Sequence, residues 1–180
     1  MNMYYIAVVL PTHLDAEIIK YKYYMLEKYE AKVGLKSPAH ITIVPPFWLH
    51  PEKEEALRWD LDQLAGGVAA FTLSTNNFAA FKPRTIYIDV VHSEPLHGLK
   101  KQADRFFTER TQYGIQIENR SFHPHITIAT RDLHKGAFAE AWPYFQNKEY
   151  KKEWTVEGLS LLRHNKKNWD VIQTSQLQSL

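Results

Sequence analysis

Apolar residues follow two spacings along this chain, and the two spacings predict two kinds of element. Short apolar runs, or apolar residues at every second position, indicate strands, whereas apolar residues three and four places apart indicate helices. Strands are predicted on this basis at 4–10, 40–44, 71–78, 85–91 and 125–128. Helices are predicted at 14–32, 51–64, 95–111 and 133–144, so the two kinds of element alternate.

Proline and glycine set the expected ends of several elements. Because proline cannot donate to a sheet ladder, Pro45-Pro46 is expected to stop the strand that begins at His40. Gly66-Gly67 is expected to close the second helix, and Gly114 the third. Near the C-terminus, residues 154–163 and 169–174 are expected to form a closing hairpin around the loop 164–168.

The string His-Ile-Thr-Ile occurs twice, as His40-Ile41-Thr42-Ile43 and as His125-Ile126-Thr127-Ile128. Each copy is predicted to be a strand, in which neighbouring side chains point to opposite faces. In each copy the histidine and the threonine therefore share one face, and the two isoleucines share the other. A groove between the two copies would hold two imidazoles and two hydroxyls.

The order of elements around the two strings indicates an internal duplication. A strand, a helix, a His-Ile-Thr-Ile strand, a helix and a further strand follow one another in both halves. A second pair of strings, Tyr5-Ile6-Ala7-Val8-Val9 and Tyr87-Ile88-Asp89-Val90-Val91, lies at nearly the same offset. We therefore expect one bilobal domain over 1–180, with pseudo-repeats at about 1–80 and 81–180, whose approximate twofold axis brings His40 and His125 to one site.

Composition limits the class of protein without identifying it. The chain has 180 residues, enough for a substantial core, and no cysteine, which excludes disulfides and thiolate metal sites. The formal net charge of +2 is too small to indicate nucleic-acid binding by itself. The apolar start has no preceding basic residue or cleavage pattern, and no apolar stretch approaches membrane-spanning length, so we expect a cytoplasmic protein that does not interact with a membrane.

Two opposed histidines fit the chemistry of phosphodiester cleavage. Histidine has an unperturbed pKa of about 6.5, so one copy can be neutral and the other protonated near neutral pH. Hydrolysis requires a proton to leave the attacking water and a proton to reach the leaving oxygen on the opposite side of phosphorus. We therefore expect His40 and His125 to be catalytic, and Thr42 and Thr127 to bind the non-bridging oxygens. No carboxylate adjoins either string, which argues against a dinuclear metal site and for a mechanism in which side chains alone move the protons.

The paired motifs closely resemble those of the two-histidine (2H) phosphoesterase superfamily, in which each motif is His-x-Thr/Ser-x with x hydrophobic. The segments 39–47 and 122–129 are most similar to the bacterial RNA 2',3'-cyclic phosphodiesterase or 2'-5' RNA ligase-like group. The resemblance spans nearly the whole chain. It implies an α+β bilobal fold in which two antiparallel sheets line a central cleft and the helices pack outside.

The resemblance also implies an activity. Members open cyclic phosphates without metal or cofactor, so we expect a phosphodiesterase acting on the 2',3'-cyclic phosphate of an RNA end or a related small nucleotide. The reverse reaction, 2'-5' RNA ligation, would use the same two histidines. By analogy His40 is the proton donor and His125 the acceptor, and the product is a 2'-phosphate. We expect the protein to act as a monomer.

One departure and several neighbouring side chains bear on the substrate. Relatives often carry arginine where this chain has Thr130, whereas Arg131 follows one place later and shares the face of His125 by strand alternation. Phe47 and Trp48 are candidates for stacking a base, or for ordinary packing. Candidate rim cations, which are equally compatible with a solvated surface, are Lys82, Arg84, Arg163, Lys166 and Lys167.

Two alternatives stay open at the level of sequence. One is an RNA- or nucleotide-binding module that keeps the cleft but turns over slowly. The other is a zinc hydrolase, because His123 precedes His125 by two residues and the pair forms a possible half-site with His40. Pro124 disturbs the strand alternation between them, which argues against this second alternative.

Overall fold

The computed structural model describes residues 1–180 and contains eight strands and four α-helices. The strands are β1 (Asn2–Val9), β2 (His40–Leu49), β3 (Phe71–Phe81), β4 (Thr85–Val90), β5 (His125–Ala129), β6 (Glu153–Val156), β7 (Gly158–His164) and β8 (Trp169–Gln176). The helices are α1 (Thr12–Tyr29), α2 (Glu54–Gly66), α3 (Glu94–Thr108) and α4 (Lys135–Gln146), with short 3-10 turns η1 (Val33–Lys36), η2 (Pro51–Lys53) and η3 (Thr111–Tyr113).

The strands form two four-stranded antiparallel sheets. Their orders are β2-β1-β7-β8 in the first sheet and β5-β4-β3-β6 in the second. Each His-Ile-Thr-Ile string therefore lies on an edge strand, β2 beside β1 and β5 beside β4. Strands β2 and β5 approach one another where the two sheets meet. The expected α+β fold with two antiparallel sheets around a central cleft is confirmed.

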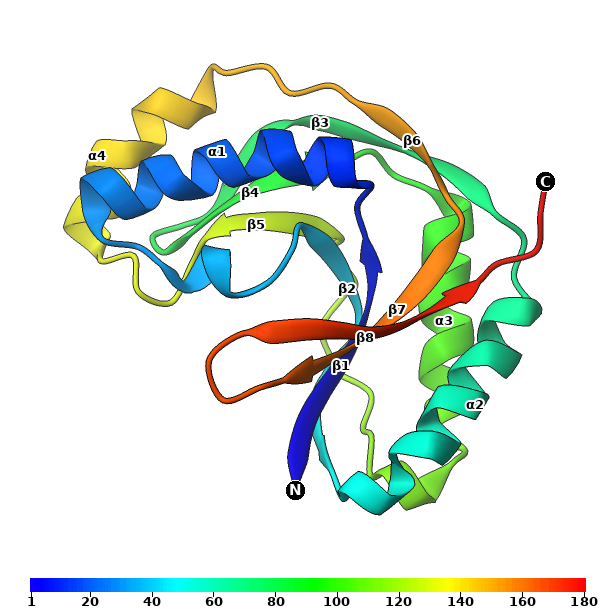
Figure 1. Ribbon diagram of the computed structural model, residues 1–180. Coiled ribbons are helices and arrows are strands. Elements are labelled where there is room, and N and C mark those ends of the chain that lie inside the picture. The colour runs from blue at the N-terminus through cyan, green and yellow to red at the C-terminus, as the bar shows by residue number, and fades with distance from the viewer.

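The helices pack outside the sheets, and two of them cross to the opposite lobe (Figure 1). Helices α2 and α3 cover the first sheet through β7, β8 and β2, whereas α1 and α4 cover the second through β5 and β3. Helix α1 thus follows a strand of the first sheet but packs on the second, and α3 does the reverse. One hydrophobic cluster of 44 buried residues extends through both lobes. None of the helices combines the length and the apolar composition needed to cross a membrane.

The prediction that Pro45-Pro46 ends the first motif strand is wrong. Strand β2 continues through both prolines to Leu49. It tolerates them because it is an edge strand, and because its ladder with β1 is irregular between Tyr4 and Ile6, opposite the prolines. Proline interrupts a ladder only where its missing N–H would have been paired.

The predicted strand over 154–163 is in fact two strands in different sheets. Strand β6 ends at Val156 in the second sheet, and β7 begins at Gly158 in the first, so only β7 and β8 form the closing hairpin. A Cβ at Gly158 would clash with the Thr174 side chain of β8, so glycine permits this close approach. The third predicted helix also ends early, at Thr108, and Gly114 instead follows η3 with a φ of 64°.

The ladders place the second pair of repeated strings two residues out of structural register. Val9 faces His40 in the β1–β2 ladder, and Asp89 faces His125 in the β4–β5 ladder. The repeated strings would instead align Val9 with Val91. A shift by two keeps the same faces together, so the alternation argument holds. The internal duplication itself stays a prediction.

Candidate active site

The two edge strands aim the motif side chains at the space between the lobes. Ile41, Ile43, Ile126 and Ile128 are completely or almost completely buried in the core. The alternation of a strand then turns the histidine and threonine of each motif to the other face. Because β2 and β5 adjoin, the two polar faces meet at one place.

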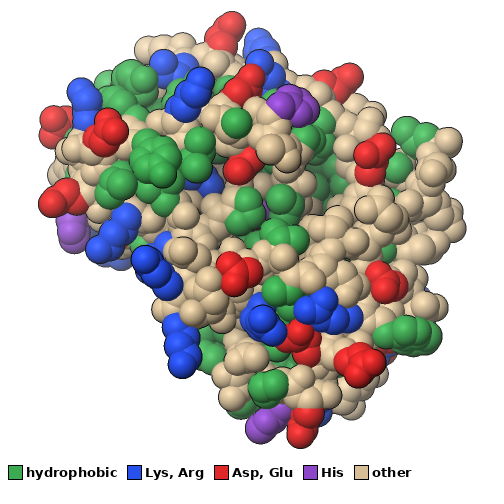
Figure 2. All heavy atoms as spheres, in the orientation of Figure 1, with side chains coloured by type: hydrophobic (Ala, Val, Ile, Leu, Met, Phe, Trp, Pro, Cys, Tyr) green, Lys and Arg blue, Asp and Glu red, His purple; other side chains and the backbone are tan.

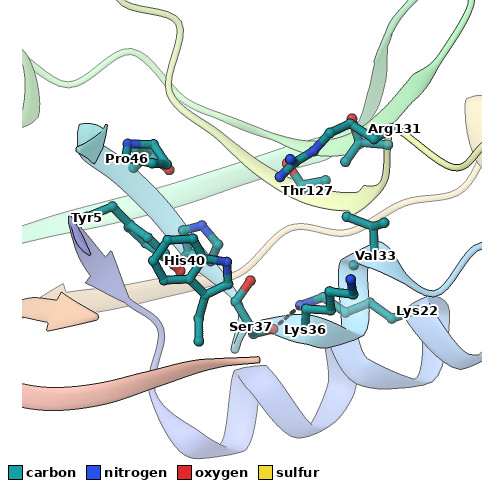
Figure 3. A pocket seen from close by; sticks show the side chains of 13 residues that line it. Tyr5, Lys22, Val33, Lys36, Ser37, His40, Pro46, Thr127 and Arg131 are labelled. Atoms are coloured by element: carbon teal, nitrogen blue, oxygen red, sulfur yellow. Dashed lines mark hydrogen bonds between the residues drawn. The ribbon is translucent and has the colours of Figure 1, made fainter. Parts of the chain in front are cut away.

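A cavity of about 220 Å³ lies between these strands (Figure 3). Three of the four predicted site residues line it, namely His40 and Thr42 from β2 and Thr127 from β5. His125 does not line it directly, but it lies on the same face of β5 two residues before Thr127 and near enough for its charge to lower the pKa of His40. The other lining residues are Tyr5, Lys22, Val33, Gly34, Lys36, Ser37, Pro46, Thr130, Arg131 and Trp169.

Both motif histidines are held in the same way. The Nδ1 of His40 lies 2.7 Å from the carbonyl oxygen of Pro38, and the Nδ1 of His125 lies 2.7 Å from that of His123. A carbonyl oxygen only accepts hydrogen bonds, so each Nδ1 carries a proton and donates. In the neutral form of either ring, Nε2 therefore has the free lone pair. The two Nε2 atoms are the groups available to move protons.

Both imidazoles are weakened as bases in the unliganded protein. Burial lowers the pKa of His40 to about 4, and the positive charges of Lys22 and His125 act in the same direction. Burial also lowers the pKa of His125, but its hydrogen bond to the His123 carbonyl and the Asp89 carboxylate oppose the shift. At neutral pH both rings are therefore mainly uncharged, and a bound anion would favour protonation of one of them.

Neither motif threonine hydroxyl hydrogen-bonds to another protein group, in contrast to Thr130, whose Oγ1 lies 3.0 Å from that of Thr85. Thr42 lines the cavity from β2 and Thr127 lines it from β5. Their hydroxyls are therefore free to donate to a ligand placed between them.

Aromatic rings flank both histidines, although they are not the rings predicted. The Tyr5 ring lies 5.0 Å from His40 and 4.6 Å from Trp169, measured between ring centroids. The rings of Tyr87 and Phe81 lie 5.3 and 5.1 Å from His125. The two stacking candidates do not line the cavity: Phe47 is buried against Tyr4, and Trp48 is exposed. The prediction missed Trp169 because it begins a strand more than a hundred residues from the first motif.

His123 makes contacts that differ from those of a metal ligand set. Its Nε2 lies 3.2 Å from the Tyr87 hydroxyl and 3.6 Å from the Asp89 carboxylate. No group of three or more His, Asp or Glu side chains is placed to hold a metal ion. Carboxylates do approach both motifs from other elements: Asp15 of α1 accepts a hydrogen bond from the Ala39 amide, and Asp89 faces His125.

Basic side chains surround the cavity more closely than the sequence indicated. Lys22, Lys36 and Arg131 line it, and no acidic side chain does. Lys and Arg side chains also gather along the side of the molecule where η1 and the β7–β8 loop lie (Figure 2). Of the predicted rim cations, Lys166 and Lys167 are exposed in that loop, whereas Arg163 is paired with Glu54 at 2.9 Å and faces α2. Arg131 lines the cavity from the turn after β5, next to Thr130.

Comparison with known proteins gives a consistent assignment. The family model of the 2'-5' RNA ligase superfamily matches residues 10–168. TT0787 of Thermus thermophilus is similar over 99% of both chains, with 20% identity and a TM-score of 0.70. E. coli LigT in its apo form is similar over 98% of both chains, with 19% identity and a TM-score of 0.63. LigT complexed with 3'-AMP is similar over the same share, with 18% identity and a TM-score of 0.59.

No significant match was found among curated proteins. At these identities the solved structures establish the fold, whereas the family model covers most of the chain, both motifs included. The chain therefore belongs to the 2'-5' RNA ligase superfamily of two-histidine phosphoesterases.

Proposed function

We propose that this protein is a phosphodiesterase that opens the 2',3'-cyclic phosphate of an RNA end or a related small nucleotide without a metal ion. Membership of the family supports phosphodiesterase-type activity on RNA or nucleotides. The observation that supports the finer proposal is the matched pair of Nδ1 hydrogen bonds, which leave Nε2 as the free nitrogen of both motif histidines, with His40 and two free threonine hydroxyls in the cavity wall. Reverse 2'-5' ligation would use the same groups.

The reaction requires one neutral and one protonated imidazole. The neutral Nε2 takes a proton from water while the water oxygen bonds to phosphorus. The bond from phosphorus to the 3' oxygen breaks, and the protonated Nε2 of the other ring gives its proton to that oxygen. The product is a 2'-phosphate with a free 3'-hydroxyl. Thr42 and Thr127 donate to the non-bridging oxygens, where negative charge increases in the transition state.

The surroundings of the two rings favour His40 as the base and His125 as the acid. Burial, with a smaller contribution from Lys22, lowers the pKa of His40 to about 4, and the residue opposite His40 in the ladder is Val9. His125 instead faces Asp89, whose carboxylate opposes the lowering of its pKa. The proton that the reaction needs is therefore more stable on His125. This proposal reverses the assignment that the family resemblance implies.

The size of the cavity supports a small reacting end. A volume of about 220 Å³ lies below the usual range for ligand pockets, roughly 300–1,000 Å³. It suits a ribose cyclic phosphate, while the base or the rest of an RNA chain would extend over the rim toward Trp169 and the exposed lysines. The structure of LigT complexed with 3'-AMP supports a nucleotide ligand in this fold.

The decisive assay uses purified protein with 2',3'-cyclic AMP and with an RNA oligonucleotide ending in a 2',3'-cyclic phosphate, both in EDTA. We expect turnover to a 2'-phosphate, and a loss of roughly 10²- to 10⁴-fold in kcat for His40→Ala and for His125→Ala. His13→Ala, an exposed histidine on α1, is the control and should retain full activity. A strict metal requirement, or full activity in both motif variants, would refute the proposal.

The acid and base roles are separated by the leaving group. A 4-nitrophenyl phosphodiester releases 4-nitrophenolate, which needs no proton from an acid. His125→Ala should therefore lose far less activity on this substrate than on 2',3'-cyclic AMP, whereas His40→Ala should lose as much on both. The opposite pattern would restore the assignment by analogy. No turnover on any substrate, with equal nucleotide binding by wild type and the double histidine variant, would instead indicate a binding module.

A further inference from the structure

Lys22 is a buried lysine in the wall of the candidate active site. It lies in the middle of α1 on the face that also buries Leu14, Ile18 and Met25. Only 3% of its surface is exposed. Because α1 crosses to the second lobe, its side chain enters the cavity beside Ser37, on the side of His40 (Figure 3).

The Lys22 ammonium has fewer hydrogen-bond acceptors than donors and has no ion-pair partner. It donates one hydrogen bond, to the carbonyl oxygen of Ser37 at 3.0 Å, and it forms no ion pair. An ammonium has three donors, and an unpaired buried charge is costly. Burial lowers the pKa of Lys22 to about 8, and Asp15 of the same helix is the one group that raises it.

The groups around Lys22 leave an anion as the missing partner. The titratable side chains that share its cavity are Tyr5 of β1, Lys36 of η1, His40 of β2 and Arg131 after β5. None of them is acidic. The Tyr5 hydroxyl is also buried without a hydrogen-bond partner. The Lys22 ammonium, which uses one of its three donors, and the Tyr5 hydroxyl, which has no acceptor, therefore belong to a cavity that already contains the free Thr42 and Thr127 hydroxyls.

We propose that the Lys22 ammonium binds a non-bridging oxygen of the substrate phosphate, as a third phosphate-binding side chain besides Thr42 and Thr127. This inference rests on the proposed function, because it assigns the phosphate of that reaction to this cavity. The phosphate supplies the counter-charge that the protein does not, and Lys22 in turn stabilises the charge that develops on the oxygen. Lys22 also adds to the lowering of the His40 pKa that burial causes, which favours the neutral ring that a base requires.

A structural role alone would give a different result on substitution. If Lys22 served only to join α1 to Ser37, its replacement by methionine would cost little in anion affinity, since methionine has nearly the same length and suits the apolar face of α1. If Lys22 binds the phosphate, the same change removes the charge that holds the ligand. Anion affinity therefore separates the two roles.

The test measures the binding of sulfate to the whole protein at constant ionic strength between pH 6.5 and 9.5, where the charge of sulfate does not change. Titration calorimetry or the sulfate-dependent rise in Tm reports the affinity. At pH 7, Lys22→Met should bind sulfate roughly tenfold to a hundredfold more weakly than wild type. Lys20→Met is the matched control, because it removes an exposed lysine of α1 outside this cavity and should bind normally.

The pH dependence provides an independent readout. Wild-type affinity should fall as the pH rises above about 8, where Lys22 loses its proton, and the affinity of Lys22→Met should be weaker and flatter over that range. An affinity of Lys22→Met within twofold of wild type at pH 7 would overturn the inference. If the methionine variant unfolds, Lys22→Gln gives the same comparison, since it removes the charge and keeps a donor for Ser37.

Sulfate binding needs no turnover, so the inference and the proposed function fail separately. Loss of sulfate affinity in Lys22→Met without hydrolysis of any cyclic nucleotide by wild type would support the anion site and refute the hydrolase. Hydrolysis that depends on both histidines but is unaffected by Lys22→Met would support the hydrolase and refute the phosphate-binding role of Lys22. If both hold, Lys22→Met should lower kcat/KM on 2',3'-cyclic AMP by at least the factor by which sulfate affinity falls.

Discussion

Asp89 faces His125 across the β4–β5 ladder, whereas Val9 occupies the corresponding position opposite His40. The two motifs are identical in sequence and in the hydrogen bond that each Nδ1 donates. The residues around the two histidines differ, so the pKa values of the two imidazoles differ. Burial lowers the pKa of both rings, but a carboxylate acts on each: Asp15 opposes the shift of His40, which Lys22 deepens, and Asp89 opposes that of His125. The deeper burial of His40, whose pKa falls to about 4, places the more stable proton on His125.

Replacing Asp89 by asparagine should therefore change the pH dependence of hydrolysis. The loss of the negative charge lowers the pKa of His125, the proposed acid, so the alkaline limb of the pH profile of kcat should move down by roughly one pH unit. Initial rates on 2',3'-cyclic AMP from pH 5 to 9 measure this. Glu27→Gln removes an exposed carboxylate of α1 and should leave the profile unchanged. A shift of the acid limb alone would assign the acid role to His40.

The threonine hydroxyls should contribute to catalysis individually. Thr42→Val and Thr127→Val keep the shape of the side chain and remove its donor, so each should lower kcat/KM by roughly 10- to 100-fold, as expected for a hydrogen bond to a charged oxygen. Steady-state kinetics at saturating and limiting substrate give the effect. Thr72→Val, an exposed threonine of β3, controls for the substitution itself. Unchanged kinetics in both motif variants would remove the threonines from the site.

The low pKa of His40 should make the protein less stable in acid. In the folded protein His40 stays neutral down to a pH of about 4, whereas in the unfolded chain it takes up a proton below about 6.5. Its contribution to stability is therefore fully present above pH 6.5 and is lost as the pH falls toward 4, by about 2 to 3 kcal/mol. Urea unfolding of wild type and His40→Gln at several pH values tests this, because the variant should show a shallower loss over that range. Parallel curves would contradict the prediction.

Gly34 of η1 should be sensitive to any side chain. A Cβ at this position would collide with the carbonyl oxygen of Ile128 in the second motif strand, a backbone atom and not the end of a flexible side chain. Asp132 fixes the same contact by accepting hydrogen bonds from the Lys32 and Val33 amides, at 2.7 and 3.0 Å. Gly34→Ala should lower the free energy of unfolding by about 1 to 3 kcal/mol and also reduce activity, since η1 contributes to the cavity wall. Denaturant unfolding and kcat/KM measure the two effects, with Gly136→Ala, where a Cβ meets nothing, as the control.

Local pattern predicted most elements because strands and helices bury periodic faces. The alternation in His-Ile-Thr-Ile placed the isoleucines in the core and the polar residues on the opposite face, as the structure shows. The errors arose where pairing overrides local preference. Pro45-Pro46 remains in a strand because the strand is at an edge, and the segment 154–163 divides because its two parts pair with different sheets.

Within the site, Lys22 also shows what a local sequence pattern predicts and what it does not. A lysine at the spacing of Leu14, Ile18 and Met25 is a charged residue on an apolar helix face, and that signal was present in the sequence. The sequence did not show that this side chain reaches the cavity, because that depends on the packing of α1 on the sheet of the opposite lobe. Trp169 and Arg131 likewise reach the cavity from distant parts of the chain.

The sequence by itself determined the α+β class, the two motif strands and the side chains on their polar faces, because these depend on periodicity over a few residues. Only the tertiary structure decided which groups surround each histidine. Strand pairing sets Asp89 opposite one ring and Val9 opposite the other, and the crossing of α1 brings Lys22 to His40. Since pKa values depend on burial and on charges a few ångströms away, two identical motifs acquire different chemistry only when the chain is folded.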